Sequence, residues 1–191
     1  MFFSIINKYI NILFRLPQSY GFGVQSPSAF SLVRDVVNED YPYYAYQEMD
    51  RLFPKLDSKV RKLNQFYFRL VNYAQLASWI DFNHSSEELQ RFIPVACNKT
   101  IYQSCSSISD FYHFDIVRIK YVNKDILNQL LNKATPKSIL IVEEIYSSKL
   151  NKDLWKSLIL DNRISTTFDL LDCGLVFFDK RPKQHYKLFL K

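Results

Sequence analysis

The sequence predicts a doubly wound α/β domain that is preceded by helices. In the second half of the chain, short apolar segments alternate with segments of helical periodicity, which is typical of parallel strands joined by crossover helices. The chain has 191 residues, 48% of them hydrophobic and 16% aromatic, so it is long enough and apolar enough for one well-buried core. We expect one compact unit, with a helical region over residues 1–76 and an α/β region over residues 77–191.

Helical patterns fill the first region. We expect a first helix over residues 2–15 that is stopped by Pro17, and a second that starts at Pro27 with Ser26 as its N-cap. Two further helices are predicted over residues 45–53 and 56–76. In the longer one, the apolar residues share a face, and the basic residues predict a solvated stripe made of Lys55, Lys59, Lys62 and Arg69.

The second region reads as strands separated by helices. The predicted strands cover residues 78–82, 100–102, 114–121, 138–142, 166–171, 175–178 and 186–190. The last three are expected to form an antiparallel ending to the sheet. Gly174 is expected at the bend between the strands at 166–171 and 175–178. The predicted helices begin at Ser85, with a capping box to Glu88, and cover residues 125–134 and 153–160.

Glycine is scarce: the chain contains Gly21, Gly23 and Gly174, with none between the last two. Doubly wound domains bind nucleotides over a glycine-rich turn after the first strand, because glycine takes positive φ and lets the backbone approach the ligand. The segment after the first predicted strand reads Asn-His-Ser-Ser over residues 83–86. We therefore expect a nucleotide-binding architecture that lacks the usual nucleotide-binding turn.

Charge and cysteine content favour a cytoplasmic protein with a solvated surface. The formal net charge of +6 is spread along the chain, which favours a basic surface over a dedicated site for an anionic partner. Cys97, Cys105 and Cys173 have no metal-site or redox-motif spacing and are expected to be reduced. The apolar first 14 residues are interrupted by polar ones and are too short to span a bilayer, so we expect no transmembrane segment.

Two sequence blocks carry a family resemblance. The first reads Gly-Phe-Gly-Val-Gln-Ser-Pro-Ser-Ala-Phe over residues 21–30, followed by Tyr-Tyr-Ala-Tyr over residues 43–46. The second reads Ile-Leu-Ile-Val-Glu-Glu-Ile over residues 139–145, with Gly-Leu-Val-Phe-Phe over residues 174–178. Together they resemble a bacterial family of class I S-adenosylmethionine-dependent methyltransferase-like proteins. The resemblance implies a Rossmann-like class I methyltransferase sheet, shortened and mixed with antiparallel C-terminal strands, under an N-terminal helical cap.

The chain departs from that family on the cofactor side. Family members read Leu-Glu-Ile-Gly-Thr-x-x-Gly at the end of the first strand, where the loop meets the methionine end of the cofactor; here Asp81 can stand for the acid and both glycines are missing. The acid that meets the ribose is replaced by Gln103, and the usual Ile-Asp-Gly of the fourth strand by Ile119-Lys120-Tyr121. The stretch between residues 104 and 114 is too short for the usual third strand and its helix.

The resemblance leaves a candidate remnant of the cofactor cleft, made of Asp81, Asn83, His84, Gln103, Lys120, Glu143 and Glu144. Glu143 and Glu144 could hold a divalent cation or act as a base, or they could be solvated carboxylates, and Lys120 is expected to pair with one of them. Asp81 and His84 could form an acid–imidazole pair or lie apart on the surface. We assign no catalytic residue and no metal site.

These observations favour a degenerate, non-catalytic methyltransferase-like protein. We expect that it does not bind S-adenosylmethionine in the usual way and that it serves as an interaction or regulatory module with a protein partner or a second copy. An active but divergent methyltransferase that does use S-adenosylmethionine is the alternative. A nucleic-acid-binding protein using the basic stripe is a second alternative, disfavoured because no known nucleic-acid-binding motif is present.

Overall fold

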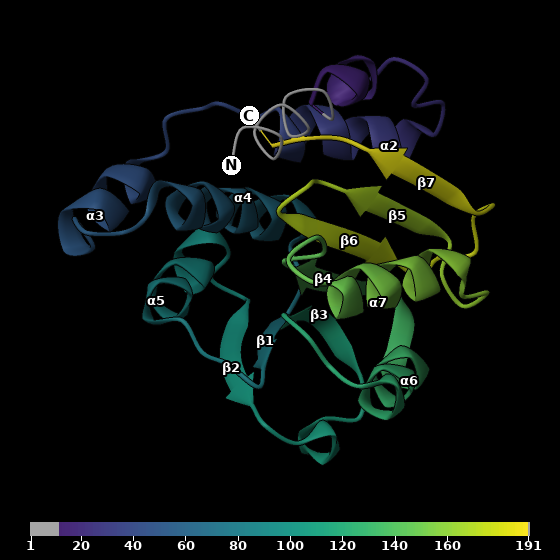
Figure 1. Cartoon of the computed structure of the whole chain (residues 1–191). Coiled ribbons are helices and arrows are strands. Elements are labelled where there is room, and N and C mark those ends of the chain that lie inside the picture. Colours follow the sequence, from purple (N-terminus) through teal and green to yellow (C-terminus); the bar gives the residue numbers. More distant parts are fainter. Residues whose placement is uncertain (1–11, 191) are drawn as a thin grey trace.

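The computed structural model describes residues 12–190, which fold around a seven-stranded mixed sheet (Figure 1). The strand order is β2-β1-β3-β4-β6-β5-β7. The strands are β1 (Ser78–Phe82), β2 (Ile101–Cys105), β3 (Phe114–Ile119), β4 (Ala134–Glu143), β5 (Thr166–Asp169), β6 (Cys173–Phe177) and β7 (Gln184–Lys187). β6 runs antiparallel to both β4 and β5, and all other neighbours are parallel. The predicted α/β fold class is confirmed.

Helices precede and connect the strands. Residues 12–19 are helical, and the later helices are α2 (Pro27–Leu32), the π-helical turn η1 (Val33–Val37), α3 (Tyr44–Leu52), α4 (Ser58–Ala74), α5 (Glu87–Ala96), the short 3₁₀ helix η2 (Ile108–Asp110), α6 (Lys124–Lys133) and α7 (Lys149–Leu160). Ser26 caps α2 with Pro27 at its first position, as the sequence predicts. No helix in the described part of the chain has the length and apolar character needed to cross a membrane.

Alternate strand residues point into two separate cores. Trp79, Ile116, Ile139 and Ile141 pack with α2, η1, α4 and α5 on one face of the sheet. Their sequence neighbours, including Ile80, Val117, Leu140 and Val142, pack with α6 and α7 on the other face. Figure 1 shows α4 and α5 on one side of the sheet and α6 and α7 on the other. Burial on both faces explains the continuous apolar run of residues 139–142 in β4.

The sheet is shortened at one edge and extended at the other. Between β2 and β3 the chain forms only the three-residue η2, so β2 is an edge strand, as the short sequence there predicts. At the other edge, β7 was expected to be antiparallel but runs parallel to β5. Thr166 at the start of β5 faces both Phe177 at the end of β6 and Gln184 at the start of β7. The short connection therefore returns the chain beside the start of β5, which makes β7 run in the same direction.

Two predicted helix boundaries are wrong. Most of the helix predicted over residues 2–15 lies outside the described residues, but the described helix passes Pro17 and continues to residue 19. The Tyr20 amide donates to the Leu16 carbonyl at 3.1 Å. A proline there removes one backbone donor and leaves the other bonds of the last turn intact. Helix α5 is capped by Ser86 rather than Ser85, because the Ser86 hydroxyl accepts from the Leu89 amide at 3.2 Å.

Gly174 lies inside β6 and not at the bend before it. The six-membered ring of Trp155 packs directly on its α-carbon, so that a Cβ at this position would lie 2.3 Å from the ring. The glycine is therefore explained by close packing of α7 on the sheet. The bend itself falls at residues 170–172, where Leu171 adopts a positive φ of 71°.

Candidate cofactor cleft

The carboxyl ends of β1, β3 and β4 bring three charged side chains together beneath α4. Asp81 of β1 lies opposite Arg118 of β3 in the sheet register, and Glu143 is the last residue of β4. All three are almost fully buried, with exposed fractions of 0%, 5% and 6%. Ligands of open α/β sheets bind at this edge of the sheet, so these residues occupy the place where a cofactor would be expected.

Four donors surround the carboxylate of Asp81. Oδ1 accepts from the indole of Trp79 at 2.7 Å and from Nε of Arg118 at 2.8 Å. Oδ2 accepts from the hydroxyl of Tyr102 at 2.6 Å and from Nη2 of Arg118. A carboxylate offers about four acceptor sites, so every site of Asp81 is used within the protein.

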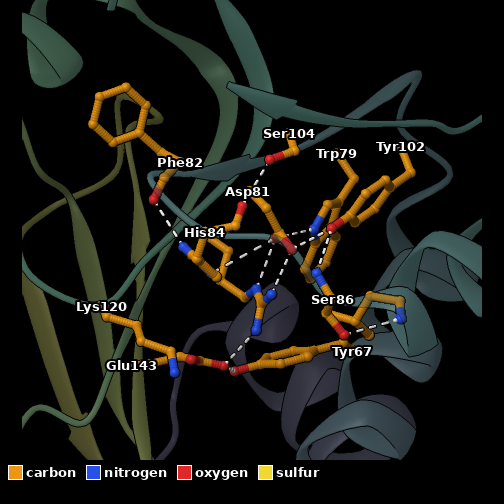
Figure 2. A network of polar contacts seen from close by, with 12 residues as sticks. Tyr67, Trp79, Asp81, Phe82, His84, Ser86, Tyr102, Ser104, Lys120 and Glu143 are labelled. Atoms are coloured by element: carbon orange, nitrogen blue, oxygen red, sulfur yellow. Dashed lines mark hydrogen bonds and ion pairs between the residues drawn. The ribbon is translucent and has the colours of Figure 1, made fainter. Parts of the chain in front are cut away.

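Arg118 joins Asp81 to Glu143. Its Nη1 donates to Oε1 of Glu143 at 2.8 Å, and the same oxygen accepts from the hydroxyl of Tyr67 in α4 at 2.7 Å. Figure 2 shows the Tyr67 hydroxyl directed at Glu143, while the side chains of Trp79 and Tyr102 converge on Asp81. One guanidinium therefore links the ends of three neighbouring strands and one helix.

The electrostatics of this cluster favour its ionised form. Burial alone would lower the pKa of Arg118, but the hydrogen bonds and charges of Asp81 and Glu143 outweigh burial and raise it. Burial and the nearby Glu143 raise the pKa of Tyr67, and burial and the hydrogen bond to Asp81 raise that of Tyr102. Both phenols consequently remain protonated donors at neutral pH.

A cavity of about 420 Å³ lies next to the cluster, within the range of roughly 300–1,000 Å³ that is typical of small-molecule pockets. Its roof comes from α4, through Lys59, Val60, Leu63 and Asn64. Its walls come from the strand ends and the following loops, through His84, Ser85, Ser86, Glu87, Glu88, Arg118, Lys120, Glu143, Glu144 and Asp172.

The loop after β1 keeps a left-handed turn without glycine. Asn83 adopts a positive φ of 59°, and its amide donates to the Cys105 carbonyl of β2 at 2.8 Å. Asparagine tolerates this conformation better than most residues. Asn83 itself is exposed and does not line the cavity, whereas His84, the next residue, does.

Asp81 and His84 are close but not hydrogen-bonded. Nε2 of His84 lies 3.9 Å from Oδ1 of Asp81, while Nδ1 lies 2.8 Å from the carbonyl oxygen of Phe82. The Phe82 carbonyl can only accept, so Nδ1 carries the proton of the neutral ring. Burial and the charge of Arg118 lower the pKa of His84, which favours that neutral ring.

The remaining candidate residues lie at the rim or outside. Lys120 forms the expected ion pair with Glu144, at 3.7 Å, and both side chains are about half exposed. Gln103 is exposed on the edge strand β2 and does not line the cavity. Its neighbour Tyr102 points to the opposite face of the strand and reaches Asp81 instead. Within the described residues, no group of acidic, histidine and cysteine side chains could hold a metal ion.

One sequence expectation outside the cleft is wrong. Arg69 was placed on the solvated basic stripe, but it is 7% exposed and its Nε donates to the Val36 carbonyl at 2.8 Å. The rings of Tyr43 and Tyr46 pack against each other and against Phe68, so they belong to the helical packing and not to the cavity. The basic stripe is therefore smaller than the helical periodicity predicts.

Sequence reasoning missed Arg118, the residue at the centre of the cluster. The usable signal was an arginine between Val117 and Ile119 in a strand that is expected to be buried, because a buried guanidinium requires acidic partners. Asp81 and Glu143, each at the end of a neighbouring strand, were the available acids. Tyr67 gives no comparable signal, since an aromatic residue on the apolar face of a helix usually belongs to a core.

No protein-family model matches the sequence, and no curated protein matches it either. Among solved structures, the chain is similar to a methyltransferase from Geobacter sulfurreducens, with 10% identity, a TM-score of 0.49, and coverage of 81% of this chain and 98% of that one. It is also similar to an SAH-bound methyltransferase from Podospora anserina, with 8% identity, a TM-score of 0.48, and coverage of 82% and 97%. A putative O-methyltransferase from Klebsiella pneumoniae is similar with 11% identity, a TM-score of 0.46, and coverage of 78% and 94%.

Proposed function

We propose that this protein is a methyltransferase-like module without methyltransferase activity. It does not bind S-adenosylmethionine in the usual way, and it acts by interacting with another molecule. The observation that carries the proposal is the position of Arg118, whose guanidinium lies between Asp81 and Glu143 at the ligand edge of the sheet. A cofactor would have to compete with a buried ion pair for the acid at the end of β1.

That competition is costly for a cofactor. Removing one partner from a buried ion pair costs about 3–5 kcal/mol, because it leaves the other charge unpaired. A ligand that took Asp81 from Arg118 would have to overcome that cost from its own binding energy. The lack of an acid for the ribose hydroxyls weakens cofactor binding further. Gln103 is exposed, and the Ser104 hydroxyl already donates to the His84 carbonyl at 2.9 Å, so neither side chain replaces that acid.

A thermal-shift titration tests this proposal. A ligand at 100 times its dissociation constant adds about 2.7 kcal/mol to the free energy of unfolding. We expect no change in the melting temperature with S-adenosylmethionine or S-adenosylhomocysteine at 1 mM, with a cofactor-binding methyltransferase as the positive control. A clear rise in melting temperature would refute the proposal.

A divergent methyltransferase remains the second candidate, and one observation favours it. The loop after β1 retains a left-handed turn at Asn83, and the adjoining cavity is large enough for a small molecule. In that case the cofactor would approach through the loop and the face of α4, leaving the Arg118 cluster in place. The same titration separates the two candidates.

The interaction role implies a protein partner, either another chain or a second copy. Sedimentation velocity over a hundredfold range of concentration tests the second copy directly. A concentration-dependent dimer would identify the partner as the protein itself, and a monomer throughout would direct the search to other proteins.

A further inference from the structure

Two residues of β2, the outermost strand at one end of the sheet, direct their backbone polar groups away from the sheet (Figure 1). The Ile101 amide donates to the Ala77 carbonyl at 2.9 Å, and the Cys105 carbonyl accepts from the loop after β1 at 2.8 Å. Because successive residues of a strand alternate in direction, Tyr102 and Ser104 point their amides and carbonyls away from β1. Within the described residues, none of these four groups has a hydrogen-bond partner.

The opposite edge of the sheet is covered. The Lys187 amide of β7 donates to Oε1 of Gln18 at 2.9 Å, and the Phe189 amide after β7 donates to Oγ of Ser19 at 3.1 Å. Both acceptors belong to the end of the first helix, residues 12–19. Side chains of that helix therefore satisfy outer donors along β7, whereas in the described part of the chain the outer donors of β2 have no such acceptors.

β2 also lacks the features that keep edge strands apart. Soluble proteins protect exposed edges with charged side chains, proline or β-bulges. β2 reads Ile-Tyr-Gln-Ser-Cys over residues 101–105 and pairs with β1 residue for residue. Ile101, at its start, is 62% exposed. An exposed, uncharged and regular edge of this kind is suited to pairing with a strand of another chain.

The outward groups of β2 are complementary to those of a second copy. In an antiparallel pair of two β2 strands centred on Gln103, Tyr102 of each copy lies opposite Ser104 of the other. Each of these residue pairs exchanges two hydrogen bonds, so all the outward amides and carbonyls are satisfied at once. Gln103 then faces Gln103 of the second copy across a two-fold axis, and Ile101 faces Cys105 on the same side of the joined sheet.

Charges at the two ends of β2 favour this register. Lys99 lies two residues before β2, and the carboxylate of Asp110 accepts from the amide of Ser107, two residues after β2, at 3.2 Å. Lys99 and Asp110 are both exposed, and neither forms an ion pair with any other described residue. Antiparallel pairing about Gln103 places Lys99 opposite Ser107 of the second copy, next to Asp110 of that copy. Opposite charges of the two copies therefore meet at both ends of the paired strands.

We propose that two copies of this protein associate through the outer edge of β2, antiparallel and centred on Gln103, so that their two sheets form one continuous sheet. The inference rests on the proposed function, because it names a second copy as the partner of the interaction module. Tyr102 then contributes twice: its backbone pairs with the second copy, and its hydroxyl donates to Oδ2 of Asp81 at 2.6 Å. The interface thus adjoins the polar cluster around Asp81.

A charge swap at Gln103 tests the proposal on the full-length protein by sedimentation velocity over a hundredfold range of concentration. We expect a concentration-dependent dimer for the wild type. Gln103→Lys and Gln103→Glu each place like charges opposite each other on the two-fold axis and should weaken the dimer at least about tenfold. An equimolar mixture of the two variants places opposite charges there and should restore the dimer. Gln129→Lys, on the exposed side of α6, should dimerise as the wild type does.

Amide hydrogen exchange locates the interface. In the wild-type dimer the amides of Tyr102 and Ser104 should be protected, and in the monomeric Gln103→Lys variant they should exchange freely. The Ile101 amide, which donates to Ala77, should be protected in both proteins and reports that the variant is folded.

A wild-type protein that is monomeric throughout overturns the inference, as does a dimer that neither Gln103 variant weakens or that the mixture fails to restore. Equal exchange of the Tyr102 and Ser104 amides in dimer and monomer overturns it too. The proposed function fails separately, by micromolar binding of S-adenosylmethionine, whichever oligomeric state is found.

Discussion

The guanidinium of Arg118 binds the carboxylate of Asp81 through two hydrogen bonds, from Nε and from Nη2. The two residues lie opposite each other on the neighbouring strands β1 and β3 and are 0% and 5% exposed, respectively. Because the pair is shielded from water, its attraction is not weakened by the solvent as that of a surface pair is. The carboxylate at the end of β1 is thus already paired within the protein.

Replacing Arg118 should destabilise the protein strongly. Arg118→Leu leaves the carboxylates of Asp81 and Glu143 buried without a cation, which costs about 3–5 kcal/mol. Urea denaturation measures this loss as a lower unfolding midpoint. The control is Arg34→Leu, which removes a cation from the exposed pair with Asp35 and should not move the midpoint. Equal midpoints for the two variants would contradict the assigned role of Arg118.

Gly174 and Trp155 should show strong energetic coupling. Gly174→Ala places a methyl group 2.3 Å from the indole ring and should cost about 1–3 kcal/mol. In the double variant Gly174→Ala/Trp155→Leu the clash is removed. Its loss of stability should therefore be smaller than the sum of the two single losses by at least about 0.5 kcal/mol. Additive losses would show that the ring moves aside freely.

Asn83 should matter for its left-handed backbone conformation and not for a tertiary contact of its side chain. Asn83→Ala removes the short polar side chain that lets asparagine tolerate the left-handed region, and it should cost about 1 kcal/mol. Asn83→Gly should leave the free energy of unfolding within about 0.5 kcal/mol of the wild-type value. Asn98→Ala, at another exposed asparagine, serves as the control in chemical denaturation. A loss in the glycine variant as large as that in the alanine variant would point to a side-chain role.

The stability of the fold should fall in mildly acidic solution. Burial is the main cause that lowers the pKa of His84 and of His185. The charge of Arg118 also lowers the pKa of His84, while the carboxylates of Asp81 and Glu143 raise it. The charges of Lys187 and Arg15 also lower the pKa of His185, while Asp169 raises it. The unfolded chain therefore binds protons near pH 6.5, where the folded protein does not.

Unfolding free energy is consequently fully retained above about pH 6.5 and declines below it, by at most about 1.4 kcal/mol per pH unit for each histidine. Denaturation between pH 7.5 and 5.5 measures this slope. His84→Gln and His185→Gln should each reduce it, and His113→Gln, at an exposed position, should not. An unchanged slope in the double variant His84→Gln/His185→Gln would contradict the assignment.

The sequence predicts the strands well because short apolar runs, buried on both faces, stand out from the helical periodicity around them. β1 covers Ser78–Phe82 as expected, and the shortened edge follows from the eight residues available between β2 and β3. The direction of β7 was not predictable from periodicity, because periodicity identifies a strand but not its neighbour. Pairing depends on which edge the connection from β6 can reach.

The candidate site was predictable only in part. Asp81, His84, Lys120, Glu143 and Glu144 all lie at the ligand edge, since the carboxyl ends of parallel strands meet there. The partners that bury Arg118 and Arg69 were not predictable. Arg118 is buried against Asp81 and Glu143, and Arg69 is buried with its Nε donating to the Val36 carbonyl. These partners lie in distant parts of the chain. The contacts themselves depend on tertiary structure: the sequence shows that an arginine lies in a strand or on a helix, but not which partners bury it.

Isothermal titration calorimetry with S-adenosylmethionine and S-adenosylhomocysteine tests the central claim most directly. If the Arg118 cluster closes the cofactor cleft, neither compound should give a heat of binding to the wild-type protein at millimolar concentration. Micromolar binding of either compound would contradict the account and identify the protein as a divergent methyltransferase.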